Sequence, residues 1–275
     1  MNRRIDMLNK EQQNELRLKY NPDGSILRSA QLRMLEMLLY IDKICRENDI
    51  EYWLEGGTLL GAVRHGGFIP WDDDADIAMT RSNYHRFRQI VLNHPHEQFV
   101  LQEHSTDSKY YNLWPVLRDL KSEYIQESLL HKVRKYRGLQ VDIFLMDDFI
   151  IQPFRLISLC VNALINKLIL FTDNPIMHFG AHGLYHLENS VLIPVFNVIS
   201  KINSNRKRLR MGYGIPFMYE FDKTDVFPVS PILFEGHWFY GPANPMNCLC
   251  KTFGDYMSIP EEKERCTHDT KIIFY

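Results

Sequence analysis

Two neighbouring glycines and a downstream run of aspartates restrict the fold of this 275-residue chain more than any other feature. Gly56-Gly57 follows a short segment of bulky residues, 50–54, which predicts a strand. The glycines let the backbone approach an anion closely, and the helix expected over residues 58–64 would point its N-terminus at that anion. Further on, Asp74 and Asp76 alternate with apolar residues, which is typical of a strand with one acidic face.

Other periodic segments complete the prediction of an α/β (α+β) fold. Residues 139–145 are mostly apolar and predict another strand, with Asp142 inside it. Residues 150–204 are predicted to be mostly helical and amphipathic. Two further helices are expected: residues 25–48, capped by Ser25, and residues 82–93, capped by Ser82. We therefore expect a polar N-terminal arm over residues 1–24 and a single domain over 25–275, with a helical insertion at about 150–204.

Composition excludes several classes of protein. The 32 basic and 34 acidic residues nearly balance, so no positive surface for nucleic acid is expected. The cysteine count of 5 is odd, which favours a reducing compartment over a disulfide framework. The first residues contain no apolar run typical of a signal peptide, and the apolar stretch from Leu156 to Phe171 looks too short and too polar to span a bilayer. These features predict a cytoplasmic protein.

The carboxylates are the residue types expected for metal-assisted chemistry. Asp74 and Asp76, at positions i and i+2 of a strand, would face the same side and repel unless a cation lies between them. Oxygen ligands on one face suit Mg²⁺ or Mn²⁺ bridging substrate phosphates. Asp142 on the other strand would complete the set. The arrangement favours phosphoryl or nucleotidyl transfer.

Two other interpretations of the acidic run fail on the sequence. An EF-hand loop beginning at Asp72 would need Gly at its sixth position and Glu at its twelfth, where Ile77 and Asn83 stand. Asp72, Asp73 and Asp76 also match the aspartate-rich motif of prenyl-diphosphate synthases. Those enzymes are all-helical and carry two such motifs. This sequence has only one, and the segments on either side of it are expected to be strands.

Histidines and cysteines offer two weaker zinc hypotheses. His178, His182 and His186 recur at helical spacing, although Gly180 and Gly183 weaken a helix there, so a histidine-bearing surface or pocket edge is the favoured interpretation. The set Cys248, Cys250 and Cys266 has no obvious fourth ligand, so ordinary buried thiols are favoured.

A basic run follows the helical insertion. It comprises Lys201, Arg206, Lys207, Arg208 and Arg210. Such a run is usually a solvated helix face. Alternatively, it meets the phosphates of a lipid-linked acceptor or an anionic bilayer, with the amphipathic stretch at 154–171 seated on the membrane surface. Burial of that stretch against the domain would explain its apolar face equally well.

The block from Glu55 to Ile77 resembles the signature of the LicD (fukutin-like) phosphotransferases, a family of the nucleotidyltransferase superfamily that includes polymerase β. The resemblance continues in three shorter segments, with Leu117 departing from the family pattern. These segments are Trp114–Asp119, Val141–Asp147, and a C-terminal block with Phe234-Glu235-Gly236, Pro242, Phe253–Met257, Pro260 and His268. The resemblance implies a polymerase β-like fold with a small mixed sheet, flanking helices and a helical insertion.

The resemblance also implies an activity. It indicates a transferase that moves a phospho-alcohol, such as phosphocholine, ribitol-phosphate or glycerol-phosphate, from a CDP-activated donor to a hydroxyl of a cell-surface glycan or its lipid-linked precursor. The reaction would depend on Mg²⁺ and release CMP. An alternative in the same fold is a nucleotidyltransferase that places AMP or CMP on a small molecule or protein and releases pyrophosphate. A non-catalytic binding module is disfavoured because it would not need three carboxylates at metal spacing.

Residue roles follow from the residues and the resemblance together. The expected catalytic residues are Asp74, Asp76 and Asp142, and the expected metal ligands are Asp74, Asp76 and Asp72. Asp142 either completes the metal site or accepts the proton of the acceptor hydroxyl. The expected substrate-binding residues are Gly56, Gly57, Thr58, Arg64, Arg118, Glu235 and His268.

Overall fold

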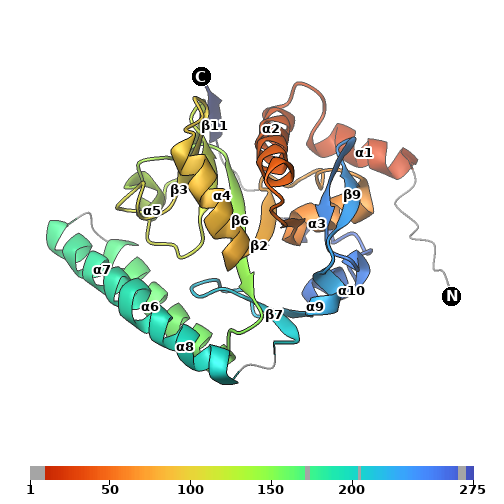
Figure 1. Ribbon diagram of the computed structural model, residues 1–275. Helices are drawn as coiled ribbons and strands as arrows, with labels where there is room; N and C mark the ends of the chain where they lie inside the picture. Colours follow the sequence, from red (N-terminus) through yellow and green to blue (C-terminus); the bar gives the residue numbers. More distant parts are fainter. Residues whose placement is uncertain (1–9, 171–173, 204–205, 266–270) are drawn as a thin grey trace.

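The computed structural model describes residues 10–170, 174–203, 206–265 and 271–275 (Figure 1). A mixed sheet stands at its centre, with spatial order β1-β2-β6-β4-β3, and β7 and β8 extend it from the far end of β6. The strands of this sheet are β1 (Trp53–Leu54), β2 (Asp76–Thr80), β3 (Phe99–Gln102), β4 (Val116–Asp119), β6 (Gln140–Asp147), β7 (Arg208–Met211) and β8 (Glu220–Asp222). Two antiparallel pairs lie outside it: β5 (Ser122–Ile125) with β11 (Lys271–Phe274), and β9 (Ser230–Phe234) with β10 (His237–Gly241).

The helices surround this sheet. They are α1 (Lys10–Tyr20), α2 (Ile26–Glu47), α3 (Gly56–His65), α4 (Arg81–Asn93), α5 (Leu129–Lys132), α6 (Gln152–Leu170), α7 (Pro175–Leu187), α8 (Ile193–Asn203), α9 (Lys223–Val226) and α10 (Pro245–Phe253). A π-helical turn, Glu188–Leu192, joins α7 to α8, and a short 3₁₀ helix covers Glu262–Glu264. The combination confirms the α/β fold class expected from the sequence.

The pairing of β2 with β6 positions the acidic residues. These strands run parallel, and Asp76 lies directly opposite Asp142. Because side chains alternate along a strand, the next residues, Ile77 and Ile143, point to the opposite face and are fully buried. On that face α2 and α4 pack against β6 and against each other. One face of the strand pair therefore builds the core, and the other carries the carboxylates.

Residues 152–170 and 175–203 are helical, as the sequence predicts, and form a hairpin of α6 against the continuous helical segment α7–α8. In Figure 1 this hairpin lies on the opposite side of the molecule from α1. Three of its polar residues point inward: Arg155 and Ser158 of α6 and Glu188 of the π-turn have no exposed surface. Ser158 and Asn162 both donate hydrogen bonds to the Glu188 carboxylate. The hairpin therefore buries a polar cluster beside apolar residues such as Ile165 and Ile169, and it is apolar on much of its outer surface.

Local details differ from the sequence-based expectations. Residues 10–20 of the expected loose arm form helix α1, which Gln13 ties to the main-chain oxygen of Arg64. Ser25 caps α2 as expected, through its bond from the Arg28 amide. Helix α4 is capped by Thr80 instead of Ser82, because the Thr80 hydroxyl accepts the amide of Asn83. Strand β2 begins at Asp76, so Asp74 lies in the extended segment just before it.

Candidate active site

Four aspartates gather at the start of β2 and on β6. Asp76 and Asp142 are neighbours across the parallel pair, and adjacent strands lie only about 4.8 Å apart. Asp72 and Asp74 arrive from the segment before β2 and are hydrogen-bonded to each other. The structure thus brings together all the carboxylates that the sequence singled out for catalysis and metal binding.

The two glycines at the start of α3 leave room for these carboxylates. A Cβ atom on Gly56 would lie 2.9 Å from Asp76 Oδ2, and one on Gly57 would lie 2.9 Å from Asp72 Oδ2. Gly56 also has a φ of +53°, a conformation that other residues rarely adopt. The acidic group therefore lies against the N-terminus of α3, whose backbone N–H groups attract anions.

The carboxylates destabilise one another's charged forms. Burial raises the pKa of Asp76 well above its usual value, and the neighbouring Asp74, Asp142 and Asp72 raise it further. Burial and the charge of Asp74 likewise raise the pKa of Asp72. Burial is also the main reason that the pKa of Asp142 is raised. Oxygen-rich clusters of this kind are relieved by a bound cation.

Asp142 is held in place by two donors that the sequence analysis did not identify. Trp114 Nε1 donates to Asp142 Oδ1 at 2.8 Å, and Gln140 Nε2 donates to Asp142 Oδ2 at 2.6 Å. Gln140 could have been found, because it stands two positions before Asp142 on the same strand and so shares its face. Trp114 comes from the loop before β4, and no short-range pattern places it there.

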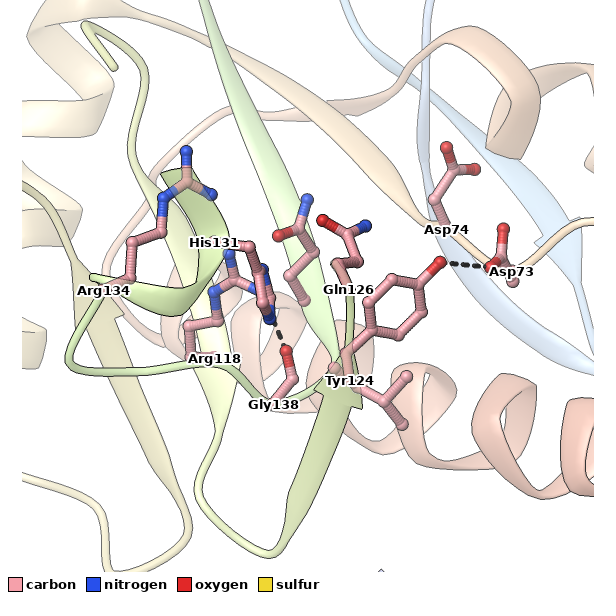
Figure 2. Close-up of a pocket in the computed structure, with 10 residues that line it drawn as sticks. Asp73, Asp74, Arg118, Tyr124, Gln126, His131, Arg134 and Gly138 are labelled. Atoms are coloured by element: carbon pink, nitrogen blue, oxygen red, sulfur yellow. Dashed lines mark hydrogen bonds between the residues drawn. The ribbon is translucent and has the colours of Figure 1, made fainter. Parts of the chain in front are cut away.

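Two cavities meet at Asp74. The larger, about 880 Å³, contains Gly56, Gly57, Asp72, Asp74 and Asp76. Aromatic side chains form much of its remaining wall: Trp71, Phe144, Phe217, Tyr219, Phe253 and Tyr256. The smaller, about 250 Å³, has Asp73 and Asp74 on one side and Arg118, His131 and Arg134 on the other (Figure 2). The acidic group therefore stands between an aromatic cavity and a basic one.

Comparison with known protein families finds a match over the segment that carries the aspartates. Residues 49–149, from just before β1 to just after β6, match the family described as LicD/FKTN/FKRP, nucleotidyltransferase domain. We call this segment, residues 49–149, the LicD domain, because it is similar to the nucleotidyltransferase domain of that family. This confirms, over that segment, the family resemblance seen in the sequence.

Individual relatives match the LicD domain over shorter stretches. The lipopolysaccharide cholinephosphotransferase LicD of Haemophilus influenzae is 46% identical over 76 residues, which is 28% of this chain and 29% of the relative. The human ribitol 5-phosphate transferase FKRP is 48% identical over 44 residues, 16% of this chain and 9% of the relative. The matched stretches thus span less than a third of either relative.

The two arginines expected to bind substrate lie in different cavities of the LicD domain. Arg64 lines the aromatic cavity and donates from Nη1 to the main-chain oxygens of Tyr256 and Ser258. Arg118 lines the basic cavity, where Gln102 and the oxygen of Gly138 accept its hydrogen bonds. Burial lowers the pKa of each arginine to about 10. Both therefore carry positive charge at neutral pH.

The other residues expected to bind substrate are Thr58, Glu235 and His268. The Thr58 hydroxyl is buried and accepts the amide of Asp76, which ties α3 to β2. Glu235 lies away from both cavities. It pairs with Arg28, at 2.6 Å, and accepts the amide of Phe68. The structure therefore gives Glu235 a bracing role and does not bring it to the carboxylates. His268 lies outside the described residues.

The weaker cysteine hypothesis finds no support in the described part of the chain. Cys248 is buried on α10, with its thiol directed at the main-chain oxygen of Asp225, whereas Cys250 is exposed. Side chains two apart on a helix face different directions. Cys266 lies outside the described residues.

Glu55, just before α3, is a further buried acid that sequence reasoning missed. Trp53 Nε1 donates to it at 2.7 Å, and the Tyr219 hydroxyl donates to its other oxygen. Burial raises the pKa of Glu55 to about 7. Tyr219 also lines the aromatic cavity, so its hydrogen bond to Glu55 holds one residue of the cavity wall in place.

Proposed function

We propose that the protein transfers a phospho-alcohol, such as phosphocholine, ribitol-phosphate or glycerol-phosphate, from a CDP-activated donor to a hydroxyl of a cell-surface glycan or its lipid-linked precursor. The observation that carries the proposal is the aspartate group at the N-terminus of α3, in a LicD domain and between two cavities. The relatives' printed names, a cholinephosphotransferase and a ribitol 5-phosphate transferase, support this reaction class.

The aspartates fit a hard divalent cation. Asp72, Asp74 and Asp76 line one cavity wall and offer only oxygen atoms, and burial together with the charge of Asp74 raises the pKa of Asp72 and of Asp76. We assign them as ligands of Mg²⁺, or of Mn²⁺, with Asp142 alongside. When bound, such a cation neutralises charge on the diphosphate of the donor.

The chain's own residues would orient the donor. Gly56 and Gly57 present backbone N–H groups at the N-terminus of α3, next to the carboxylates, where a diphosphate would be held. Arg64 adds positive charge in the same cavity. Aromatic rings in this cavity, Phe144 and Tyr219 among them, offer faces for the pyrimidine base. We therefore place the nucleotide in the larger cavity.

The acceptor would approach from the basic cavity. Arg118 and Arg134 face Asp74 across it, which suits a phosphorylated or polar glycan end (Figure 2). An oxygen–phosphorus bond forms between the acceptor and the phosphorus bearing the alcohol, and the bond from that phosphorus to CMP breaks. Asp142 either receives the acceptor proton or completes the metal-binding set. Its two fixed hydrogen bonds suit either role.

The test is a ligand panel on the purified protein. Thermal stability is measured with Mg²⁺ and CDP-choline, CDP-ribitol, CDP-glycerol, CTP or ATP. A ligand at 100 times its dissociation constant adds about 2.7 kcal/mol to stability, which raises Tm by several degrees. We expect a metal-dependent shift with one CDP-alcohol, absent in Asp76→Asn.

The matched control is Asp49→Asn, because Asp49 is exposed, does not line either cavity, and has a φ of +49° that Asn tolerates. It should shift like the wild type. A shift with CTP or ATP alone would contradict the proposal. It would favour the nucleotidyltransferase alternative, which agrees with the description of the matched family as a nucleotidyltransferase domain. No shift with any CDP-alcohol would also contradict it.

We further propose that the helical hairpin seats the protein at the cytoplasmic face of a membrane. Helix α6 is 19 residues long, and an 18-residue stretch of it has a mean hydropathy of 1.4, which by length and composition alone would allow it to cross a membrane. Large apolar side chains are exposed along the hairpin: Leu156, Ile157, Leu164, Leu170, Ile176, Met177, Phe179, Leu187, Val191, Val195, Val198, Ile199 and Ile202. Exposed basic residues follow them, namely Lys201, Arg206, Lys207 and Arg208. Apolar surface beside basic charge is typical of a helix lying on an anionic bilayer.

Vesicle flotation tests this placement. The protein should float with phosphatidylglycerol vesicles at low salt, and Ile176→Gln with Phe179→Gln should weaken flotation several-fold, because these side chains are 74% and 81% exposed. The matched control is Trp238→Gln, which removes an exposed apolar residue on β10. Absence of flotation by the wild-type protein at low salt would contradict the proposal.

A further inference from the structure

Three histidines come together where the hairpin meets the sheet. His104 follows β3, and His182 and His186 stand one turn apart on α7. One ligand atom from each lies within 4.8 Å of the other two. His178, which the sequence grouped with the latter two, is not a member, and its place is taken by His104 from a distant part of the chain.

We propose that His104, His182 and His186 form a binding site for Zn²⁺ or a similar borderline transition metal. Nitrogen donors suit Zn²⁺, Co²⁺, Ni²⁺ or Cu²⁺, whereas Mg²⁺ prefers the oxygen atoms of the aspartate group. The inference goes beyond the proposed transfer reaction and does not depend on it.

The spacing of the nitrogens suits a shared cation. His182 Nε2 and His186 Nε2 are 3.0 Å apart. Two ligand nitrogens on a tetrahedral zinc, each about 2.0–2.1 Å from the metal, lie roughly 3.3 Å apart. The pair therefore needs to open by only a few tenths of an ångström to accept the ion.

The third histidine is oriented by a backbone carbonyl. His104 Nδ1 lies 3.1 Å from the main-chain oxygen of Tyr110. Because a carbonyl can only accept, Nδ1 carries the hydrogen, and Nε2 keeps the lone pair for a metal. A backbone carbonyl behind a ligating imidazole is the usual outer partner in metal sites. Tyr185 packs against the same ring, with centroids 4.0 Å apart, and limits its rotation.

Three imidazoles leave a fourth coordination position. His186 is exposed, whereas His104 and His182 are partly buried, so that position would open to water. The ligands come from the turn after β3 on one side and from α7 on the other. A bound ion would therefore fix the orientation of the hairpin relative to the LicD domain.

Metal titration of the full chain tests the site. After removal of metals with a chelator, Zn²⁺ binding is measured by isothermal titration calorimetry, and tetrahedral coordination by the visible absorption of Co²⁺. We expect one high-affinity ion per chain, a Co²⁺ spectrum of nitrogen-ligand type, and a rise in Tm. His104→Ala, His182→Ala and His186→Ala should each weaken Zn²⁺ binding by at least tenfold.

Two controls separate this site from others. His178→Ala removes a histidine from the same helix and should leave Zn²⁺ binding unchanged. Asp76→Asn alters the aspartate group and should also leave it unchanged. No high-affinity Zn²⁺ binding by the wild type, or unchanged binding in the His182→Ala and His104→Ala variants, would overturn the proposal. Failure of the donor panel described above would not bear on it.

Discussion

The residues at the site are packed so closely that a methyl group added at either glycine would collide with an aspartate carboxylate. Gly57 lies where its missing Cβ would contact the carboxylate of Asp72, and Gly56 lies in the same relation to Asp76. The acidic residues and the N-terminus of α3 thus share one small space. Glycine is needed at both positions because a larger residue would push the carboxylates away, in addition to any role in holding a phosphate.

Gly57→Ala tests that requirement. The new methyl would displace the Asp72 carboxylate, so we expect turnover to fall by ten- to a hundredfold while the fold is retained, since a shift of about 1 Å at a site has such an effect. The matched control is Gly183→Ala on α7, where nothing lies within 4 Å of the added Cβ. That variant should keep its activity and gain up to about 1 kcal/mol in stability. Equal activity in both variants would contradict this account.

The aspartates could be predicted from the sequence, whereas their partners could not. Asp76 and Asp142 stand on segments that the sequence predicts as strands, so one acidic site was expected, but only the pairing of β2 with β6 sets the two opposite each other. Glu235 shared a family motif, yet it pairs with Arg28, a contact across 207 positions. Trp114 likewise reaches Asp142 from a loop. Long-range side-chain contacts of this kind leave no local pattern in a sequence.

At the scale of elements, the helical hairpin is the least conventional part of the molecule. Its helical state followed from spacing in the sequence, but the side that faces inward did not, because the buried residues include Arg155, Ser158 and Glu188. Apolar residues share the same side, since Ile165 and Ile169 of α6 are also fully buried. Arg155 Nη2 donates to the main-chain oxygen of Ile215, and Ser158 and Asn162 donate to Glu188, and only the tertiary structure defines these hydrogen bonds.

Glu188 makes the stability of this hairpin depend on pH. Burial raises the pKa of Glu188 to about 7 from 4.5, so the folded state binds a proton that the unfolded state has lost over this interval. Its contribution to the free energy of unfolding is therefore greatest below pH 4.5 and falls as pH rises to about 7, by roughly 3 kcal/mol at most.

Glu188→Gln should remove this contribution, since the amide oxygen can still accept hydrogen bonds from Ser158 and Asn162. We expect the variant to match the wild type at pH 4.5 and to exceed it in stability at pH 8. Urea denaturation at several pH values measures the difference. Parallel curves for the two proteins across this range would contradict the raised pKa.

The whole molecule combines a LicD domain with flanking segments that the domain match does not cover. The match ends at residue 149, and the hairpin, the far strands β7 and β8 and helix α10 follow it. Residues from this later part, such as Phe217, Tyr219 and Tyr256, nevertheless line the aromatic cavity. Under the proposed function, the choice of donor alcohol would therefore depend partly on residues outside the shared domain.

Metal dependence belongs to this scale, because the two proposed cation sites lie in different parts of the molecule. Removal of Mg²⁺ should abolish transfer and leave the orientation of the hairpin unchanged. Removal of Zn²⁺ should lower Tm and loosen the hairpin without abolishing transfer. Activity assays and limited proteolysis, run with each metal added back singly, measure the two effects. Restoration of transfer to metal-free protein by Zn²⁺ and not by Mg²⁺ would contradict the assignment of the aspartates.

The most direct test of the central claim is the identity of the nucleotide product. Purified protein is incubated with Mg²⁺, the CDP-alcohol that stabilises it and a hydroxyl-bearing glycan acceptor, and the products are resolved by phosphorus NMR. The account predicts CMP and a phosphodiester on the acceptor, with turnover lower by at least a thousandfold in Asp76→Asn. Release of pyrophosphate from a nucleoside triphosphate, or full turnover by Asp76→Asn, would contradict it.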